Sequence, residues 1–329
     1  MAIKQILTAS FITAALSANA FAQDVRVGYW ASGASAAIGI VLEEGKFLEA
    51  EGLKPKWTTV SKLAEVNRAL ISKSIDIAVA GGTLPSLRLG AEGVPAKIIL
   101  ANLIADANFV VPENSPIKSL ADLKTKKVGS TPPGSTMHAL VATILQSHGL
   151  SEKDFSQIPS GEAQLIAFMQ RGDIDAAVMR TITLRTIGAQ AKLRVLATVP
   201  EEWKKIIKAD SPPVLGVGVV DEEFAKKNMD LVVKYVAANI KATQWGSKNP
   251  DKVAEMLRRR LQMSDADAQA FAATWNASYF VSMDEADIAS LLKMAEIFKG
   301  ADNFTGTVTR DVFMTEPYTK AKALVGTGG

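Results

Sequence analysis

Apolar residues along this chain alternate between two patterns, short continuous runs that are typical of buried strands and the spacing of one helical face. The segment VRVGYW at residues 25–30 is short and rich in β-branched and aromatic residues, which is typical of a buried strand. Ile38, Val41 and Leu42 then recur on one helical face, and they predict a helix over residues 36–50. Further strands are expected at residues 53–60, 75–80, 97–102, 127–130, 174–179 and 193–199. This alternation of strand and helix indicates an α/β protein with largely parallel sheets.

The other helical patterns lie between these strands and, from residue 224 onward, follow one another. Gly52 and Gly149 each close a helix in the way that C-terminal glycines commonly do. Besides 36–50, helices are expected at residues 64–72, 84–90, 137–146, 162–171, 231–246, 251–261, 265–276 and 285–298. A chain of this length usually forms two domains.

The first 22 residues have a different pattern. Lys4 precedes an apolar run over residues 6–16, and Ala20-Phe21-Ala22 places small residues at the positions that signal peptidase requires. The run is too short to span a membrane, because a spanning helix needs about 20 apolar residues. We therefore expect a cleavable secretory signal peptide at residues 1–22. The chain contains no cysteine that could be acylated, so the expected location is the periplasm, without a lipid anchor.

Charged residues are interspersed along the chain. The 37 basic and 34 acidic side chains nearly balance, and Arg258-Arg259-Arg260 is the densest basic cluster. Because this cluster lies in a helical pattern, we interpret it as a solvated helix face and expect no nucleic-acid partner.

The sequence offers little that indicates catalysis. His138 and His148 lack the spacing of a metal site, and no GxSxG, P-loop or zinc motif is present. The absence of cysteine also excludes thiol nucleophiles and disulfides. We expect no catalytic residues, no metal site and no cofactor.

Several blocks along the chain carry a resemblance to a known family. They are VRVGYW, EEGKFLEAEGL, RALISKSIDIAVAGGTLPSL, GVPAKIIL, SLADLKTKKVGSTPPGST, AFMQRGDIDAAVM, VVDEEFAKKN and ATQWGSKNPDKVAEML. In this order and spacing the chain resembles the substrate-binding proteins of nitrate, sulfonate and taurine type ABC importers, together with their pyrimidine-precursor-binding relatives. One departure is Lys73-Ser74, where the family commonly has a small residue and glycine.

The resemblance implies a two-lobed periplasmic-binding-protein fold of type II, the Venus-flytrap fold, with extra C-terminal helices. The chain would cross between the lobes near residues 103–109 and 210–216. Residues 23–105 and 213–329 would form the first lobe, and residues 106–212 the second. Hinge closure around a ligand in the cleft is the expected motion.

Candidate ligand-binding residues in the first lobe follow two strand ends, where open α/β sheets bind their ligands. Trp30 and Ser32 follow the first strand and offer an aromatic wall and a hydroxyl, although Trp30 is equally suited to plug the lobe core. Gly82 and Thr83 end another strand before a helix. They bring free backbone N–H groups and one hydroxyl to the cleft, unless the segment is a plain turn.

Candidates in the second lobe are Ser135, Thr136 and Arg180. Ser135 and Thr136 stand at the start of helix 137–146, whose N–H groups and dipole favour an anion; capping alone is the alternative. Arg180 follows strand 174–179 and can hold a carboxylate or sulfonate through two parallel hydrogen bonds, with a surface salt bridge as the alternative.

Asn108 and Phe109 are further candidates for lining the cleft or hinge near the first crossing. Trp30 and Phe109 favour an organic ligand over an inorganic ion. The leading hypothesis is a monomeric solute receptor that delivers a small organic anion, a sulfonate or carboxylate, to an ABC permease in the inner membrane. An enzyme on a similar scaffold, acting on a pyrimidine or porphyrin precursor, is the alternative, and a regulator's effector-binding domain is the third. The sequence leaves the solute open.

Overall fold

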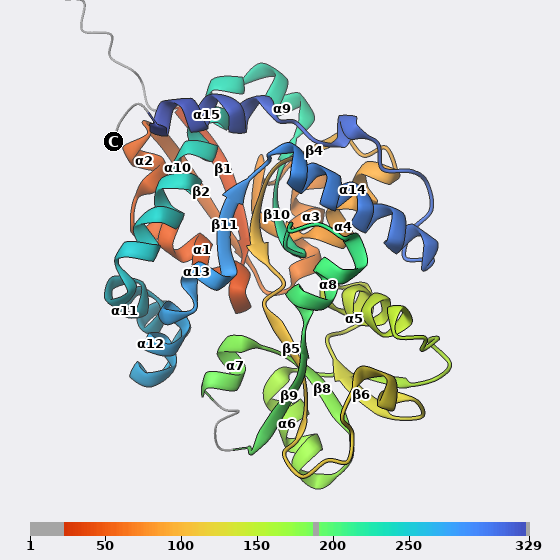
Figure 1. Ribbon diagram of the computed structural model, residues 1–329. Helices are drawn as coiled ribbons and strands as arrows, with labels where there is room; N and C mark the ends of the chain where they lie inside the picture. Colours follow the sequence, from red (N-terminus) through yellow and green to blue (C-terminus); the bar gives the residue numbers. More distant parts are fainter. Residues whose placement is uncertain (1–22, 187–190, 327–329) are drawn as a thin grey trace, which may run out of the picture.

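Two β-sheets, each at the centre of one lobe, organise the computed structural model (Figure 1). The structure describes residues 23–186 and 191–326, so the expected signal peptide at residues 1–22 lies outside the described residues. No helix within the described ranges is long and apolar enough to cross a membrane.

The first sheet has six strands in the order β11-β4-β10-β3-β1-β2. Its strands are β1 (Gln23–Trp30), β2 (Leu53–Val60), β3 (Ile77–Gly82), β4 (Ala96–Ile104), β10 (Val214–Asp221) and β11 (Tyr279–Ser282). β1 pairs in parallel with β2 and β3, whereas β10 is antiparallel to both β3 and β4, and β11 is antiparallel to β4.

The second sheet has five strands in the order β7-β6-β8-β5-β9. They are β5 (Ala107–Pro112), β6 (Lys127–Ser130), β7 (Ser156–Pro159), β8 (Ala176–Arg180) and β9 (Leu193–Thr198). β6 is parallel to β7 and β8, and β5 is antiparallel to β8 and β9.

The expectation of largely parallel sheets is wrong, because both sheets are mixed. β4 continues through residues 105–106 directly into β5 of the other sheet. The chain returns through residues 208–213 into β10, which inserts between β4 and β3. Since β4 leaves the first lobe and β10 re-enters it, the two strands run in opposite directions.

Helices cover the sheets of both lobes (Figure 1). Those of the first lobe are α1 (Gly33–Glu44), α2 (Phe47–Ala50), α3 (Leu63–Ile71), α4 (Thr83–Ala91), α9 (Glu222–Lys227), α10 (Met229–Lys248), α11 (Pro250–Leu261), α12 (Asp265–Ala273), α13 (Trp275–Ser278), α14 (Glu285–Gly300) and α15 (Glu316–Gly326), with the 3-10 turn η3 (Arg310–Val312). Those of the second lobe are η1 (Leu120–Leu123), α5 (Thr136–Ser147), α6 (Glu162–Arg171), α7 (Thr181–Thr186) and α8 (Val199–Ile207).

Three expected elements have the bounds that the sequence predicts: strands 53–60 and 127–130 and helix 162–171. The expected helix 36–50 is instead two helices, because Lys46 takes a left-handed conformation with φ 52° between α1 and α2. The structure also contains elements that the sequence pattern does not predict, namely β5, β7, β10, β11, α7, α8, α9 and α15.

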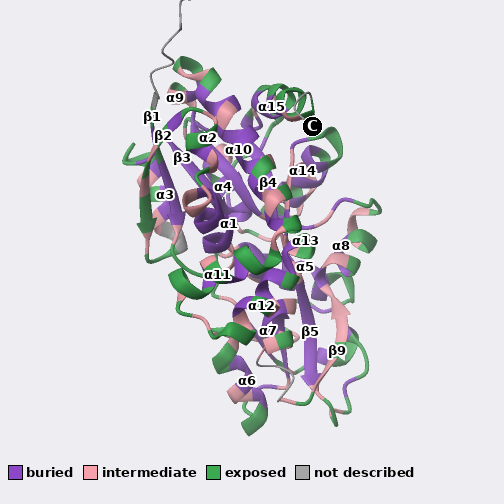
Figure 2. Ribbon diagram, turned by 90° about the vertical axis from the view of Figure 1, so that its left-hand side faces the viewer, coloured by how far each residue is buried: buried purple, intermediate pink, exposed green. Residues whose placement is uncertain are grey.

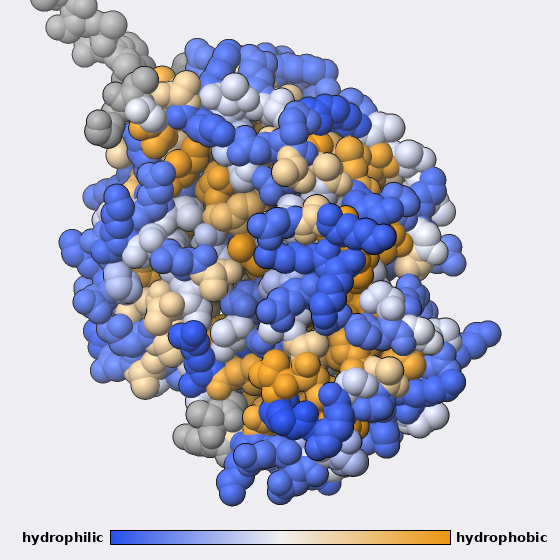
Figure 3. Space-filling model, in the orientation of Figure 1, coloured by the Kyte–Doolittle hydropathy of each residue, from blue (hydrophilic) through white to orange (hydrophobic). Residues whose placement is uncertain are grey.

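Buried residues concentrate on the strands and on parts of the helices around them (Figure 2). One helix packs very closely against its sheet, where α1 crosses β1. A Cβ atom on Gly39 would come within 2.6 Å of the Tyr29 ring, so glycine lets the helix lie directly on that ring. Outside the core, hydrophilic side chains cover most of the face in Figure 3, and apolar side chains gather over the second lobe.

Candidate functional site

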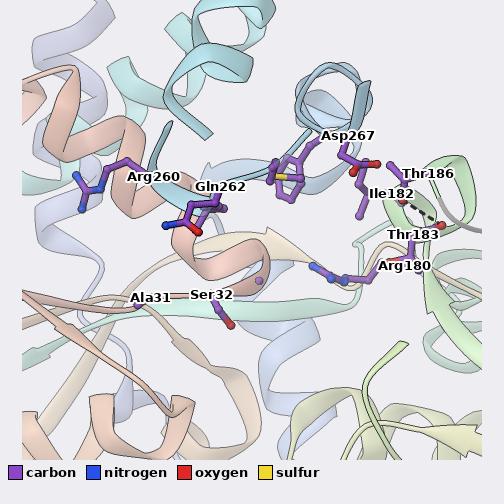
Figure 4. A pocket seen from close by; sticks show the side chains of 13 residues that line it. Ala31, Ser32, Arg180, Ile182, Thr183, Thr186, Arg260, Gln262 and Asp267 are labelled. Carbon is purple, nitrogen blue, oxygen red and sulfur yellow. Dashed lines mark hydrogen bonds between the residues drawn. The ribbon is translucent and has the colours of Figure 1, made fainter. Parts of the chain in front are cut away.

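A cavity of about 510 Å³ lies between the two lobes (Figure 4). The first lobe contributes the turn after β1, the C-terminal end of α11 with the turn that follows it, and part of α12. The second lobe contributes the end of β8 and α7. The lining residues are Ala31, Ser32, Gly33, Arg180, Ile182, Thr183, Thr186, Arg260, Leu261, Gln262, Met263, Asp267 and Phe271.

Arg180 reaches this cavity because it is the last residue of β8. Its neighbour across the sheet is Ala107, the first residue of β5 after the crossing between the lobes. Its side chain is 29% exposed, and the guanidinium extends from the strand end toward Ser32 and Gln262 (Figure 4). The two terminal guanidinium nitrogens make no hydrogen bond with any residue that the structure describes. Arg180 therefore presents to the cavity two terminal nitrogens that no described residue engages.

Glu162 fixes the other edge of the Arg180 guanidinium. It is the first residue of α6, and its Oε1 accepts hydrogen bonds from Arg180 Nε at 2.9 Å and from the Arg180 backbone N–H at 3.4 Å. Its Oε2 accepts a hydrogen bond from the Thr183 hydroxyl of α7. Glu162 is only 15% exposed, so one carboxylate holds both the arginine and the helix that follows it.

Arg260 also lines the cavity, but its guanidinium is already paired within the first lobe. One terminal nitrogen donates to the Tyr29 hydroxyl oxygen and to Glu43 Oε2, both at 3.0 Å, and the other lies 3.4 Å from Glu44 Oε1. In Figure 4 it points away from Arg180. Burial and the hydrogen bond to Glu43 raise the pKa of the Tyr29 hydroxyl. Arg260 therefore anchors the end of α11 to β1 and α1.

Asp106 links the lobes at the crossing between β4 and β5. Its carboxylate accepts hydrogen bonds from the Thr181 hydroxyl of the second lobe at 2.6 Å and from the Ser278 hydroxyl of the first at 3.5 Å. It borders a small recess that Arg180 also lines. Burial raises the pKa of Asp106, while Thr181 and Ser278, and more weakly Arg185 and Arg180, act in the opposite direction.

The lobes also touch where α4 and α5 begin. The Leu84 backbone N–H, in the first turn of α4, donates to Thr136 Oγ1 of the second lobe at 3.0 Å. Thr83 is wholly buried beside it, and its hydroxyl has no hydrogen-bond partner among the described residues. Ser135 caps α5 by accepting a hydrogen bond from the His138 N–H at 3.3 Å. Thr136 thus closes an inter-lobe contact in this arrangement.

Two of the nine candidate ligand-binding residues, Ser32 and Arg180, line the cavity. The other seven do not: Trp30, Gly82, Thr83, Asn108, Phe109, Ser135 and Thr136.

Some of these seven have clear structural partners. The Trp30 indole N–H donates to the Ser61 carbonyl at 3.1 Å, and Asn108 Nδ2 donates to the Thr181 hydroxyl oxygen at 3.0 Å. Phe109 is fully buried in the hydrophobic core on the strand between β8 and β9, so it packs the lobe instead of lining the cavity. Ligand contact by any of the nine stays a prediction.

Sequence reasoning missed Glu162, Asp106 and the turn between α11 and α12. A weak signal existed for the turn, since Arg258-Arg259-Arg260 marks a helix C-terminus, where basic side chains are favoured. No comparable signal marks Glu162, because its role arises only when α6 packs beside the end of β8.

Comparison with known proteins shows the family to which this chain belongs. The family model described as NMT1/THI5 like matches residues 37–253, well over half of the chain. The chain belongs to the NMT1/THI5-like family. This NMT1/THI5-like protein is 25% identical, over 252 residues, to the taurine-binding periplasmic protein of Escherichia coli, with 76% of this chain and 75% of the relative covered.

Solved structures confirm the expected two-lobed fold. The periplasmic aliphatic sulphonate binding protein of Escherichia coli superimposes with a TM-score of 0.74 at 20% identity, covering 89% of this chain and 92% of that one. The desulfurization enzyme DSZB shares the fold more distantly, with a TM-score of 0.66 at 15% identity, covering 92% of this chain and 99% of that one. The resemblance to substrate-binding proteins of sulfonate and taurine importers is likewise confirmed.

Proposed function

We propose that this NMT1/THI5-like chain is the periplasmic solute-binding component of an ABC importer, and that it binds a small organic anion, a sulfonate or carboxylate, between its lobes. The names of the two binding proteins to which it is similar support this class of ligand. The observation that carries the proposal is Arg180, whose two terminal nitrogens face a cavity formed by both lobes and have no hydrogen-bond partner among the described residues. We further propose that the secreted protein carries no lipid anchor, acts as a monomer and delivers its solute to an inner-membrane permease.

Binding follows from the way Glu162 holds Arg180. Because Nε is already engaged, the guanidinium offers its two terminal nitrogens side by side, and these match two oxygens of one sulfonate or carboxylate. An arginine held in its binding orientation loses less conformational entropy when the ligand arrives. Ser32, Gln262 and Thr183 line the same cavity and supply neutral polar groups around the anion.

Closure of the lobes follows from the shared lining. The anion would contact Arg180 of the second lobe while its remainder contacts the first lobe, so the ligand favours the arrangement in which both surfaces meet. The proposed lobes comprise residues 23–105 with 213–329, and residues 106–212. The change of sheet at residues 105–106 and 208–213 supports a hinge at these two crossings.

Isothermal titration calorimetry of purified protein with ethanesulfonate, hexanesulfonate, benzenesulfonate, hexanoate and benzoate tests the proposal. Arg180→Ala should weaken binding of any ligand found by about 10-fold to 100-fold, because it removes charge-assisted hydrogen bonds. Arg171→Ala is the matched control, since Arg171 is 56% exposed in the same lobe and pairs with Asp173. If Arg180→Ala and Arg171→Ala both bind like the unchanged protein, Arg180 does not hold the anion.

An enzyme on the same fold is the second candidate, and the shared fold of the desulfurization enzyme supports keeping it. The two functions differ in their products. A receptor binds its solute, which raises the unfolding temperature of the protein, and releases that solute chemically unchanged. An enzyme converts it into a product. Mass spectrometry of each ligand after prolonged incubation with the protein separates them, and a converted ligand would favour the enzyme.

A further inference from the structure

The cavity that holds Arg180 is also lined by four apolar side chains. Leu261, Met263 and Phe271 come from the first lobe and Ile182 from the second, and we call these four residues the apolar wall. Phe271 and Ile182 are buried, whereas Leu261 and Met263 are half-buried and pack against the core. The wall therefore has a rigid part and a part that can adjust to a ligand.

The backbone on both sides of Met263 has a fixed conformation, while its side chain can adjust. α11 ends at Leu261, and Gln262 takes a left-handed conformation with φ 53° that turns the chain. Ser264 then caps α12, because its hydroxyl oxygen accepts the Asp267 N–H at 3.1 Å. Met263 lies between these two fixed points. Methionine has an unbranched, polarisable side chain that adapts to varied apolar shapes.

We propose that the apolar wall is the subsite for the organic body of the solute, so that the preferred solute is a monoanion with one sulfonate or carboxylate and an aryl group or an alkyl chain of four or more carbons. The inference rests on the proposed function, because Arg180 must hold the anionic group. A cavity of about 510 Å³ lies within the range of roughly 300–1,000 Å³ that sites for drug-sized ligands occupy. A two-carbon solute would leave most of the wall uncovered.

The charged groups of the cavity limit the ligand to one negative charge. Arg260 is engaged by Glu43, Glu44 and Tyr29, so it is not free for a second anionic group. Asp267 also lines the cavity, and its carboxylate accepts a hydrogen bond from the Ser264 hydroxyl at 2.7 Å. That carboxylate repels a second anion. It is also the group that would receive an ammonium if the solute were a small aminosulfonate such as taurine.

Calorimetry with a chain-length series tests the wall. Affinity should rise by about fourfold for each added methylene, the equivalent of ~0.8 kcal/mol, and therefore by roughly 250-fold from ethanesulfonate to hexanesulfonate. Met263→Gln should weaken hexanesulfonate by about tenfold and leave ethanesulfonate within about twofold, because only the longer chain reaches the wall. Met256→Gln is the matched control, since Met256 is half-buried on α11 outside the cavity.

The outcomes distinguish the role of the apolar wall from the binding of the anion by Arg180. Equal affinity along the series, with binding still lost in Arg180→Ala, overturns the wall and leaves the anion receptor standing. Taurine binding more tightly than hexanesulfonate, with that preference removed by Asp267→Asn, overturns the wall in favour of an aminosulfonate site. If none of the sulfonates or carboxylates binds, the proposed function fails and the inference fails with it.

Discussion

Glu162 gives the sharpest test of the proposed anion site, because it carries the same sign of charge as the ligand yet should assist binding. Its carboxylate accepts a hydrogen bond from Arg180 Nε at 2.9 Å and another from the Thr183 hydroxyl. Removing the carboxylate has two opposite effects. It frees Arg180 to leave its binding orientation, and it takes away a negative charge that repels the anion.

A pair of substitutions separates the two effects. Glu162→Gln and Glu162→Ala both remove the charge, so the relief of repulsion is the same in each. Only glutamine keeps an oxygen that can accept the hydrogen bond from Arg180 Nε. A hydrogen bond to a charged group contributes about 1.5 kcal/mol or more, which corresponds to roughly tenfold in Kd. We therefore expect the alanine variant to bind about tenfold more weakly than the glutamine variant.

Calorimetry with the tightest sulfonate measures this ratio, and thermal unfolding of each variant checks that it is folded. Glu152→Ala is the surface control, since Glu152 is an exposed glutamate of the same lobe. In an Arg180→Ala background the ratio should fall to one, because no arginine remains to be oriented. Equal affinities of the glutamine and alanine variants in the presence of Arg180 would refute the orienting role.

Two further predictions concern Asp106 and Tyr29. Burial raises the pKa of Asp106 above its ordinary value of 3.8, so its ionisation disfavours the folded state once the pH exceeds that value. Asp106→Asn should therefore gain in unfolding temperature relative to the unchanged protein between pH 4 and pH 7, and show no such gain below pH 3.8; calorimetric melting at each pH checks this. Tyr29→Phe removes a buried hydroxyl that donates to Glu43 at 2.6 Å and accepts from Arg260 at 3.0 Å. It should lower the free energy of unfolding by about 1–2 kcal/mol in urea titrations, and an unchanged midpoint would contradict this account.

The sequence predicted those elements whose signals are local. Helix 162–171 has the expected bounds because Gly172 ends it with φ 78°, a conformation that glycine adopts readily. β10 was missed because Gly216 and Gly218 weaken its strand pattern. The structure explains both glycines, since a Cβ atom on Gly216 would come within 3.1 Å of Leu103, and one on Gly218 within 2.8 Å of Leu100, in the neighbouring strand. α7 was missed because TITLRT is rich in β-branched residues, and it is helical in its place after β8.

The two cavity arginines show why a site needs more than its residue types. Arg180 and Arg260 carry the same side chain, line the same cavity and each lie at the end of a regular element. The terminal nitrogens of Arg260 donate hydrogen bonds to Tyr29, Glu43 and Glu44, so its charge is paired within the first lobe. Glu162 instead meets Arg180 at Nε, and no residue in the described part of the chain pairs with the terminal nitrogens. The position of the neighbouring acid on the guanidinium, at its side or at its end, therefore decides which arginine is available to an anion, and that position depends on how α6 packs against β8.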